Sequence, residues 1–150
     1  MMVADLTRIP NPSEFAFSCS TASATRPRII AAEDDPDCGL ALEVLLSAAY
    51  DVSVVPCGRD LLRLLESERA DLIVLDYQLP DINGLRVMET VRRHFGIATP
   101  AIAVSAFSSR RNACLRAGFS TFLQKPFGRV DLIWAVERGL RADSRGSAGA

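Results

Sequence analysis

The sequence predicts an α/β domain, a doubly wound sandwich in which helices cover both faces of a five-stranded parallel sheet. Short apolar segments alternate strictly with segments of helical period from residue 28 to residue 140, as expected for parallel strands joined by right-handed crossovers. Four of the five apolar segments end on an acid, a hydroxyl or a lysine. Ligands bind at the carboxyl ends of the strands in such sheets, so the same pattern predicts where a site lies.

Composition limits the class of protein. The chain has 150 residues, 49% apolar and 23% charged, which suffices for one domain with its own core. Its net charge of −1 provides no electrostatic attraction to nucleic acids or anionic membranes. Four scattered cysteines without metal-ligand spacing indicate reduced thiols, and no apolar run approaches the ~18 residues of a membrane span. We therefore expect a cytoplasmic protein that binds neither nucleic acid nor membrane.

One domain is expected over residues 27–141. Residues 1–26 mix Pro, Ser, Thr and Ala without a sustained period, which predicts a flexible leader. Its few apolar residues leave open whether the leader folds back on the domain or docks on a neighbour. Residues 142–150, rich in Gly, Ala and Ser, predict a flexible tail or a truncated linker.

The first two strand–helix units follow from apolar spacing. The run 29–32 predicts a buried strand. Pro36 opens a helix over about 37–49, since proline suits the first turn and an acid follows it. The run 52–55 predicts a second strand, and leucines at helical spacing predict a helix over 58–68.

The strand at Leu72–Asp76 is the centre of the predicted fold. Four consecutive apolar residues indicate burial on both faces, and Asp76 stands where the strand ends, before a Pro and Gly loop that runs to Gly84. An acid inside a buried strand would only cost desolvation free energy, whereas an acid at the strand end can meet a ligand. We therefore take Asp76 as the candidate reactive residue.

The alternation continues to the end of the domain. Apolar spacing predicts a third helix from residue 85 to about residue 95, and a fourth strand follows at 101–105. A short helix over 109–117 is stopped by a glycine. A fifth strand at 121–125 ends on a lysine, and the last helix is expected over 129–140.

Polar side chains stand at the ends of four different strands: Glu33 with Asp34, then Asp76, Ser105 and Lys125. Because the carboxyl ends of parallel strands lie along one edge, these side chains can converge. Carboxylates gathered at one point repel each other unless they share a cation, and oxygen ligands suit Mg²⁺. A carboxylate can also act as a nucleophile and form an acyl phosphate, with the metal and an ammonium offsetting the phosphoryl charge.

Four segments carry a family resemblance: Ile29–Pro36 (IIAAEDDP), Asp71–Gly84 (DLIVLDYQLPDING), Thr99–Ala106 (TPAIAVSA) and Ala117–Phe127 (AGFSTFLQKPF). Through them the chain resembles the receiver domain of two-component response regulators. The resemblance implies a flavodoxin-like (βα)5 sandwich. It also implies that a histidine kinase or a histidine phosphotransfer protein transfers a phosphoryl group to Asp76 in a Mg²⁺-dependent reaction, in which Mn²⁺ can substitute.

The resemblance also assigns roles to the other residues of the site. It implies metal ligation by Glu33, Asp34, Asp76 and the backbone carbonyl of Gln78, a switch hydroxyl on Ser105, a phosphate-pairing cation on Lys125 and the aromatic switch position at Phe122. Phosphorylation would change the surface of the fourth helix, fifth strand and fifth helix. That surface would control a downstream protein or an output domain on a longer chain. Whether the chain also forms a homodimer through this surface is left open.

This sequence departs from the family pattern in several places. The acid run is Glu-Asp-Asp, so Asp34 and Asp35 are an alternative metal pair, although Asp35 precedes Pro36 and should point into the loop. Phe122 has no phenolic hydroxyl, so it can switch only through burial. The segment after Ser105 is short, and Phe107 stands where it could shield an acyl phosphate from water and lengthen its lifetime.

Rival functions lack their key residues. A haloacid-dehalogenase-like phosphatase would need a second acid two residues after the nucleophile, where this chain has Gln78. Neither phosphate-binding glycine motif of nucleotide-binding domains is present. A receiver-like docking module that works without phosphorylation remains the runner-up. We therefore expect no turnover enzyme, only self-phosphorylation from a donor and slow autodephosphorylation. No output domain is expected after Leu140, so the chain is a stand-alone receiver or a piece of a longer protein.

Two further residues, His94 and Trp134, are not assigned to the site. His94 is predicted to be a cation at a helix C-terminus rather than a phosphodonor. Trp134 falls between the inward positions of the last helix, and partial packing or a partner contact are both left open.

Overall fold

The computed structural model describes residues 26–148, and their side chains as far as Arg141. All but Arg26 of the predicted leader lies outside the described residues. In chain order the elements are β1 (Arg28–Ala32), α2 (Pro36–Leu46), β2 (Asp51–Val55), α3 (Gly58–Ser67), β3 (Leu72–Asp76), α4 (Gly84–Thr90), the π-helix η1 (Val91–Phe95), β4 (Ala101–Ser105), the 3-10 turn η2 (Ser108–Arg110), α5 (Arg111–Arg116), β5 (Thr121–Gln124) and α6 (Arg129–Ala148).

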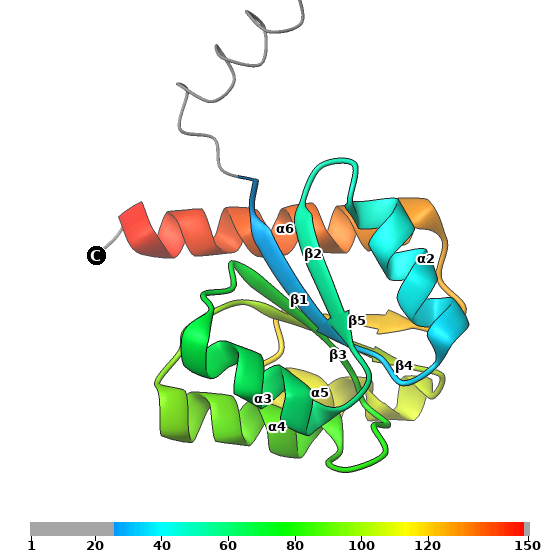
Figure 1. Ribbon diagram of the computed structural model, residues 1–150, viewed down its shortest axis with the longest axis horizontal. Helices are drawn as coiled ribbons and strands as arrows, with labels where there is room; N and C mark the ends of the chain where they lie inside the picture. Colours follow the sequence, from blue (N-terminus) through cyan, green and yellow to red (C-terminus); the bar gives the residue numbers. More distant parts are fainter. Residues whose placement is uncertain (1–25, 149–150) are drawn as a thin grey trace, which may run out of the picture.

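The five strands form one parallel sheet in the order β2-β1-β3-β4-β5. Helices α2 and α6 cover one face of this sheet, and α3, α4 and α5 cover the other (Figure 1). The predicted doubly wound (βα)5 sandwich is therefore confirmed. No helix among residues 26–148 is long and apolar enough to cross a membrane.

Strand β3 lies at the centre of the sheet and every one of its residues is buried. Its side chains alternate between two separate cores. Ile73 and Leu75 join the core beneath α3, α4 and α5, whereas Leu72 and Val74 join the core beneath α2 and α6. The continuous apolar run that predicted this strand is thus explained by burial on both faces.

Some helix ends differ from the predicted ones. Helix α2 stops at Leu46 rather than near residue 49, and residues 47–49 form a turn in which the amides of Ala49 (3.2 Å) and Tyr50 (2.9 Å) both donate to the Leu46 carbonyl before β2 begins. The predicted third helix ends as expected at Gly96, whose φ of +61° terminates it, but its last turn is a π-helix. Helix α6 extends to Ala148, beyond the predicted end at residue 140.

Candidate phosphorylation and metal site

The ends of β1, β3, β4 and β5 meet at one edge of the sheet, as predicted. In the register of β3 with β4, Asp76 lies opposite Val104, and the Tyr77 amide donates to the Val104 carbonyl (2.8 Å). On the other side of β4, the Lys125 amide donates to the Ser105 carbonyl (2.8 Å). The Lys125–Pro126 peptide bond is cis. These ladders fix the strand ends from which the site residues project.

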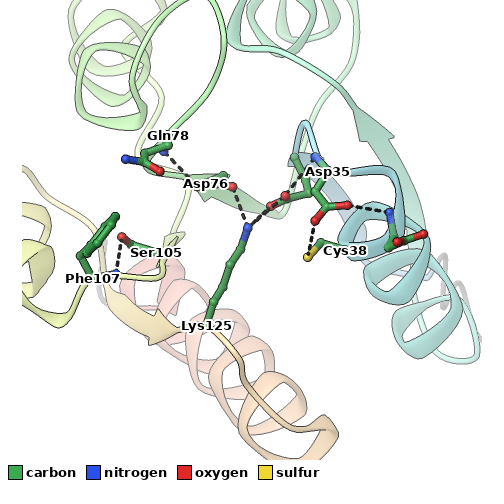
Figure 2. A network of polar contacts seen from close by, with 9 residues as sticks. Asp35, Cys38, Asp76, Gln78, Ser105, Phe107 and Lys125 are labelled. Atoms are coloured by element: carbon green, nitrogen blue, oxygen red, sulfur yellow. Dashed lines mark hydrogen bonds and ion pairs between the residues drawn. The ribbon is translucent and has the colours of Figure 1, made fainter.

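Lys125 forms ion pairs with two carboxylates of the site. Its Nζ donates to Asp76 Oδ2 (2.8 Å) and to both carboxylate oxygens of Glu33 (3.0 and 2.9 Å), as Figure 2 shows from close by. Glu33 and Asp76 are each 5% exposed. Removing a pair of carboxylates from water is costly unless a cation is close to both. The lysine supplies that cation in the absence of a phosphoryl group.

The protonation of Glu33 and Lys125 is tuned by this arrangement. Burial, together with the neighbouring Asp76 carboxylate, raises the pKa of Glu33 to about 7, and Lys125 opposes this rise only in part. Burial alone would lower the pKa of Lys125, but its hydrogen bonds to Asp76 and Glu33 outweigh burial and raise that pKa. The site therefore holds more negative charge than one ammonium neutralises.

Three carboxylates form a cluster that could hold a metal ion. One oxygen from each of Glu33, Asp34 and Asp76 lies within 4.8 Å of the others. An all-oxygen set of this kind, with Asp34 exposed to solvent, suits Mg²⁺, which keeps several waters. Asp35 serves differently, since its side chain accepts from the Asp37 amide (2.9 Å) and caps α2. The geometry thus favours the pair Glu33–Asp34 over Asp34–Asp35.

Gln78 and Ser105 both lie to the left of Asp76 in the view of Figure 2. The backbone amide of Gln78 donates to Asp76 Oδ1 (2.9 Å), and Lys125 Nζ donates to Asp76 Oδ2, so each oxygen of this carboxylate accepts a hydrogen bond. The Ser105 hydroxyl is buried and accepts from the Phe107 amide (3.1 Å). Phe107 itself is half exposed beside Ser105.

The remaining predicted residues are placed as follows. Phe122 is buried in the core beneath α3, α4 and α5, so the aromatic switch position points inward in this structure. His94 lies in the last turn of η1 beside two arginines, at a helix C-terminus as predicted. Trp134 is 55% exposed, and the Arg138 guanidinium stacks on its ring at 5.0 Å.

Sequence reasoning missed two sets of contacts at this edge. One is the pairing of Lys125 with Glu33, 92 positions away in sequence. The other is made by Asp81, whose carboxylate accepts from the first two amides of α3, Gly58 (2.9 Å) and Arg59 (2.8 Å). A signal for the second existed. The residue before α3 is Cys57, which makes no capping bond, so a cap from elsewhere was needed.

Comparison with known proteins identifies the family. Residues 29–137 match the family model of the response regulator receiver domain. The chain is a member of this family. A 14.6 kDa protein from Leptolyngbya boryana is 35% identical to the receiver domain over 114 residues, which are 73% of this chain and 87% of that protein. The transcriptional regulatory protein PrrA of Mycobacterium tuberculosis is 36% identical over 78% of this chain, which spans about half (51%) of PrrA.

Solved receiver domains share the fold. The receiver domain of response regulator 1452 from Francisella superposes with a TM-score of 0.73 at 26% identity, covering 78% of this chain and 98% of that one. The receiver domain of a sensor histidine kinase from Pseudomonas aeruginosa superposes with a TM-score of 0.70 at 31% identity, over 77% and 98% of the two chains. That structure has a magnesium ion coordinated in its active-site cleft. Receiver domains are in general not classical enzymes.

Proposed function

We propose that Asp76 of this receiver domain accepts a phosphoryl group from a histidine kinase or a histidine phosphotransfer protein and thereby switches a partner-binding surface. The observation that carries the proposal is the contact of Asp76 Oδ2 with Lys125 Nζ (2.8 Å) inside a three-carboxylate cluster. A buried acid with a cation and two further acids beside it suits nucleophilic chemistry on a phosphoryl group.

In the reaction, a carboxylate oxygen of Asp76 attacks the phosphorus of the donor's phosphohistidine. The new O–P bond forms as the N–P bond breaks, and the imidazole nitrogen keeps the electron pair of that bond. The Gln78 amide and the Lys125 ammonium hold the carboxylate in one orientation before the donor arrives. Mg²⁺ would be held by Glu33, Asp34, Asp76 and the Gln78 carbonyl, and it would offset the charge of the transferred group.

Phosphorylation adds negative charge next to the Lys125 ammonium, which already bonds the carboxylates of Glu33 and Asp76. The ammonium then has a stronger partner in the phosphoryl oxygens, and the carboxylates of Glu33, Asp34 and Asp76 would hold Mg²⁺, whose charge would offset theirs. The Ser105 hydroxyl, which accepts from the Phe107 amide, can rotate to donate to a phosphoryl oxygen. A displacement of this strand end would be passed to η2, which begins at Ser108, to α5, which follows it, and to Phe122 on β5.

A groove of about 480 Å³ beside the acids offers a place for the phosphodonor. It runs between α2 and the end of β2 and is lined by the acid run together with apolar side chains, among them Leu40, Val54 and Pro56. Leu40 and Val44 on α2 are 60% and 65% exposed. Exposed aliphatic residues next to a reactive site fit a protein donor better than a small molecule. The downstream target would use the surface of α5, β5 and α6, where β5 forms the other edge of the sheet from β2.

The proposal is tested with a small phosphodonor such as acetyl phosphate and Mg²⁺. The intact mass of the wild-type protein should rise by one phosphoryl group, and that of Asp76→Asn should stay unchanged. Omitting Mg²⁺ or adding a chelator should prevent the rise. An unmodified wild-type protein under these conditions would contradict the proposal and favour the phosphorylation-independent docking module.

A further inference from the structure

The N-terminus of α3 is capped by a residue from another part of the chain. Helices need acceptors for their first amides, and these normally come from the residue that precedes the helix. Here Cys57 makes no such bond. Instead Asp81 Oδ1 accepts from the Gly58 amide (2.9 Å) and Asp81 Oδ2 from the Arg59 amide (2.8 Å), across 23 and 22 positions of sequence. The cap therefore ties α3 to the loop that follows Asp76.

Helix α4 approaches α3 closely enough at Gly58 to require a glycine, and the loop lies in ordinary van der Waals contact with the same position. A Cβ atom at Gly58 would lie 2.7 Å from Val87 Cγ2 and 3.5 Å from both Asp81 Oδ1 and Ile82 Cβ. The loop and the start of α4 thus rest directly on the backbone of α3. This close packing is a second observation, independent of the hydrogen bonds, that the loop and α4 are complementary in shape to the start of α3.

The loop itself is closed at its base. The Gly84 amide donates to the Tyr77 carbonyl (2.8 Å), and a Cβ at Gly84 would lie 2.7 Å from the Asp76 carbonyl oxygen. Between these points the Gln78 amide bonds Asp76 Oδ1. Residues 77–84 are therefore held at the base by the bond between Gly84 and Tyr77 and farther along by Asp81, and Gln78, which contacts the Asp76 carboxylate, lies between these two anchors in sequence.

We infer that Asp81 is a positioning residue for the site: it anchors the loop of residues 77–84 to α3 and so fixes where Gln78 presents its amide and its carbonyl. This inference rests on the proposed function, because the Gln78 carbonyl acts as a ligand only if Mg²⁺ binds beside Asp76. Residues that orient metal ligands typically change metal affinity by about 10- to 100-fold when they are lost. Asp81 touches neither the metal ligands nor Lys125 among its described bonds.

Mg²⁺ titration by calorimetry tests the inference. Asp81→Ala should bind Mg²⁺ about tenfold more weakly than the wild type, and Asp81→Asn, which keeps one acceptor oxygen, should recover most of that loss. Asn83→Ala is the matched control, since it removes the cap of α4 from the same loop (Asn83 Oδ1 to the Arg86 amide, 2.9 Å). The control should bind Mg²⁺ within about twofold of the wild type.

A double-mutant cycle adds a specific readout. Gly58→Ala must displace Val87, whose Cγ2 would lie 2.7 Å from the added Cβ, and with it the first turn of α4 that follows the loop, so it should weaken Mg²⁺ binding as Asp81→Ala does. The double variant should then lose little more than the larger single loss, because both changes free the same loop. Faster hydrogen exchange of the Gln78 amide in Asp81→Asn and Asp81→Ala, with the Asp37 amide unchanged, would show the loosening even if one variant is poorly folded.

The outcomes separate the inference from the proposed function. Wild-type protein that neither binds Mg²⁺ nor accepts phosphate contradicts the proposed function and the inference with it. Normal wild-type binding, with Asp81→Ala unchanged or with Asn83→Ala equally weakened, contradicts only the positioning role of Asp81.

Discussion

Replacing Lys125 by methionine tests the electrostatic description of the site, because methionine keeps the apolar stem of the lysine and removes its charge. In the structure the ammonium bonds both Glu33 and Asp76, which are buried. Without it these carboxylates face each other with no cation between them. Two unit charges 4.8 Å apart repel by about 3.5 kcal/mol at an effective dielectric constant of about 20. We expect Lys125→Met to lose roughly 3 kcal/mol of unfolding free energy at pH 8 without metal.

The size of this loss should depend on pH. The pKa of Glu33 rises from its ordinary value of 4.5 to about 7 on folding, so raising the pH through this range already costs the wild-type fold free energy. Without Lys125 the folded pKa of Glu33 rises further and the cost at pH 8 grows. At pH 5 Glu33 carries a proton in both proteins, so the difference between them is smaller.

Urea unfolding of the metal-free proteins at pH 5 and pH 8 measures both effects. Arg63→Met is a suitable control, since Arg63 makes only an exposed contact with Asp60 (3.9 Å) and should change stability little at either pH. A loss in Lys125→Met that is equal at the two pH values would refute the view that the lysine acts by neutralising buried carboxylates.

Three further predictions concern the lifetime of the phosphate, the metal and the loop. Phe107→Ala should lose its phosphoryl group faster than the wild type, because the half-exposed ring beside Ser105 no longer limits water; equal rates in a timed mass measurement would contradict this. Mg²⁺ affinity should fall below pH 7, by up to about tenfold per pH unit, because Glu33 must release its proton, and Glu33→Gln should abolish this slope in calorimetry. Gly84→Ala should lose roughly 1–3 kcal/mol in urea unfolding, since its Cβ would lie 2.7 Å from the Asp76 carbonyl oxygen. Gly128→Ala is its control, with the nearest atom 3.8 Å from the added Cβ, and similar losses in the two would show that the contact is not the cause.

The strands and the residues at their ends could be predicted because the physics there is local. Strands β1, β3 and β4 are short apolar runs buried on both faces, as the strands of a parallel sheet covered by helices are expected to be. Asp76, Ser105 and Lys125 stand at strand ends in the sequence, and parallel pairing alone brings them to one edge. Fold and site membership thus follow from pattern and topology together.

Contacts between distant segments could not be predicted in this way. Apolar periodicity does not show that the Lys125 ammonium forms an ion pair with Glu33, or that the Asp81 carboxylate caps a helix that begins more than 20 positions earlier in the chain. The Arg92 guanidinium also donates to the carbonyls of Ile97 and Thr99, just beyond the π-helical turn at Val91–Phe95, and apolar periodicity indicates neither these bonds nor the π-helical turn. Such choices depend on which partner lies nearest in three dimensions.

The sheet divides the interior of this receiver into two cores that share only the strands, and this has consequences for engineering. The loop after Asp76 rests on one of them, through Tyr77, Leu79 and Ile82, whereas α2 and α6 are packed on the other. Stabilising substitutions in the core beneath α2 and α6 should therefore leave the packing of this loop unchanged, as long as the exposed surfaces of α2 and α6 are kept for the proposed donor and target. The same substitutions beneath α3, α4 and α5 would change the packing on which the loop rests. The core beneath α2 and α6 is thus the better place for stabilising the protein.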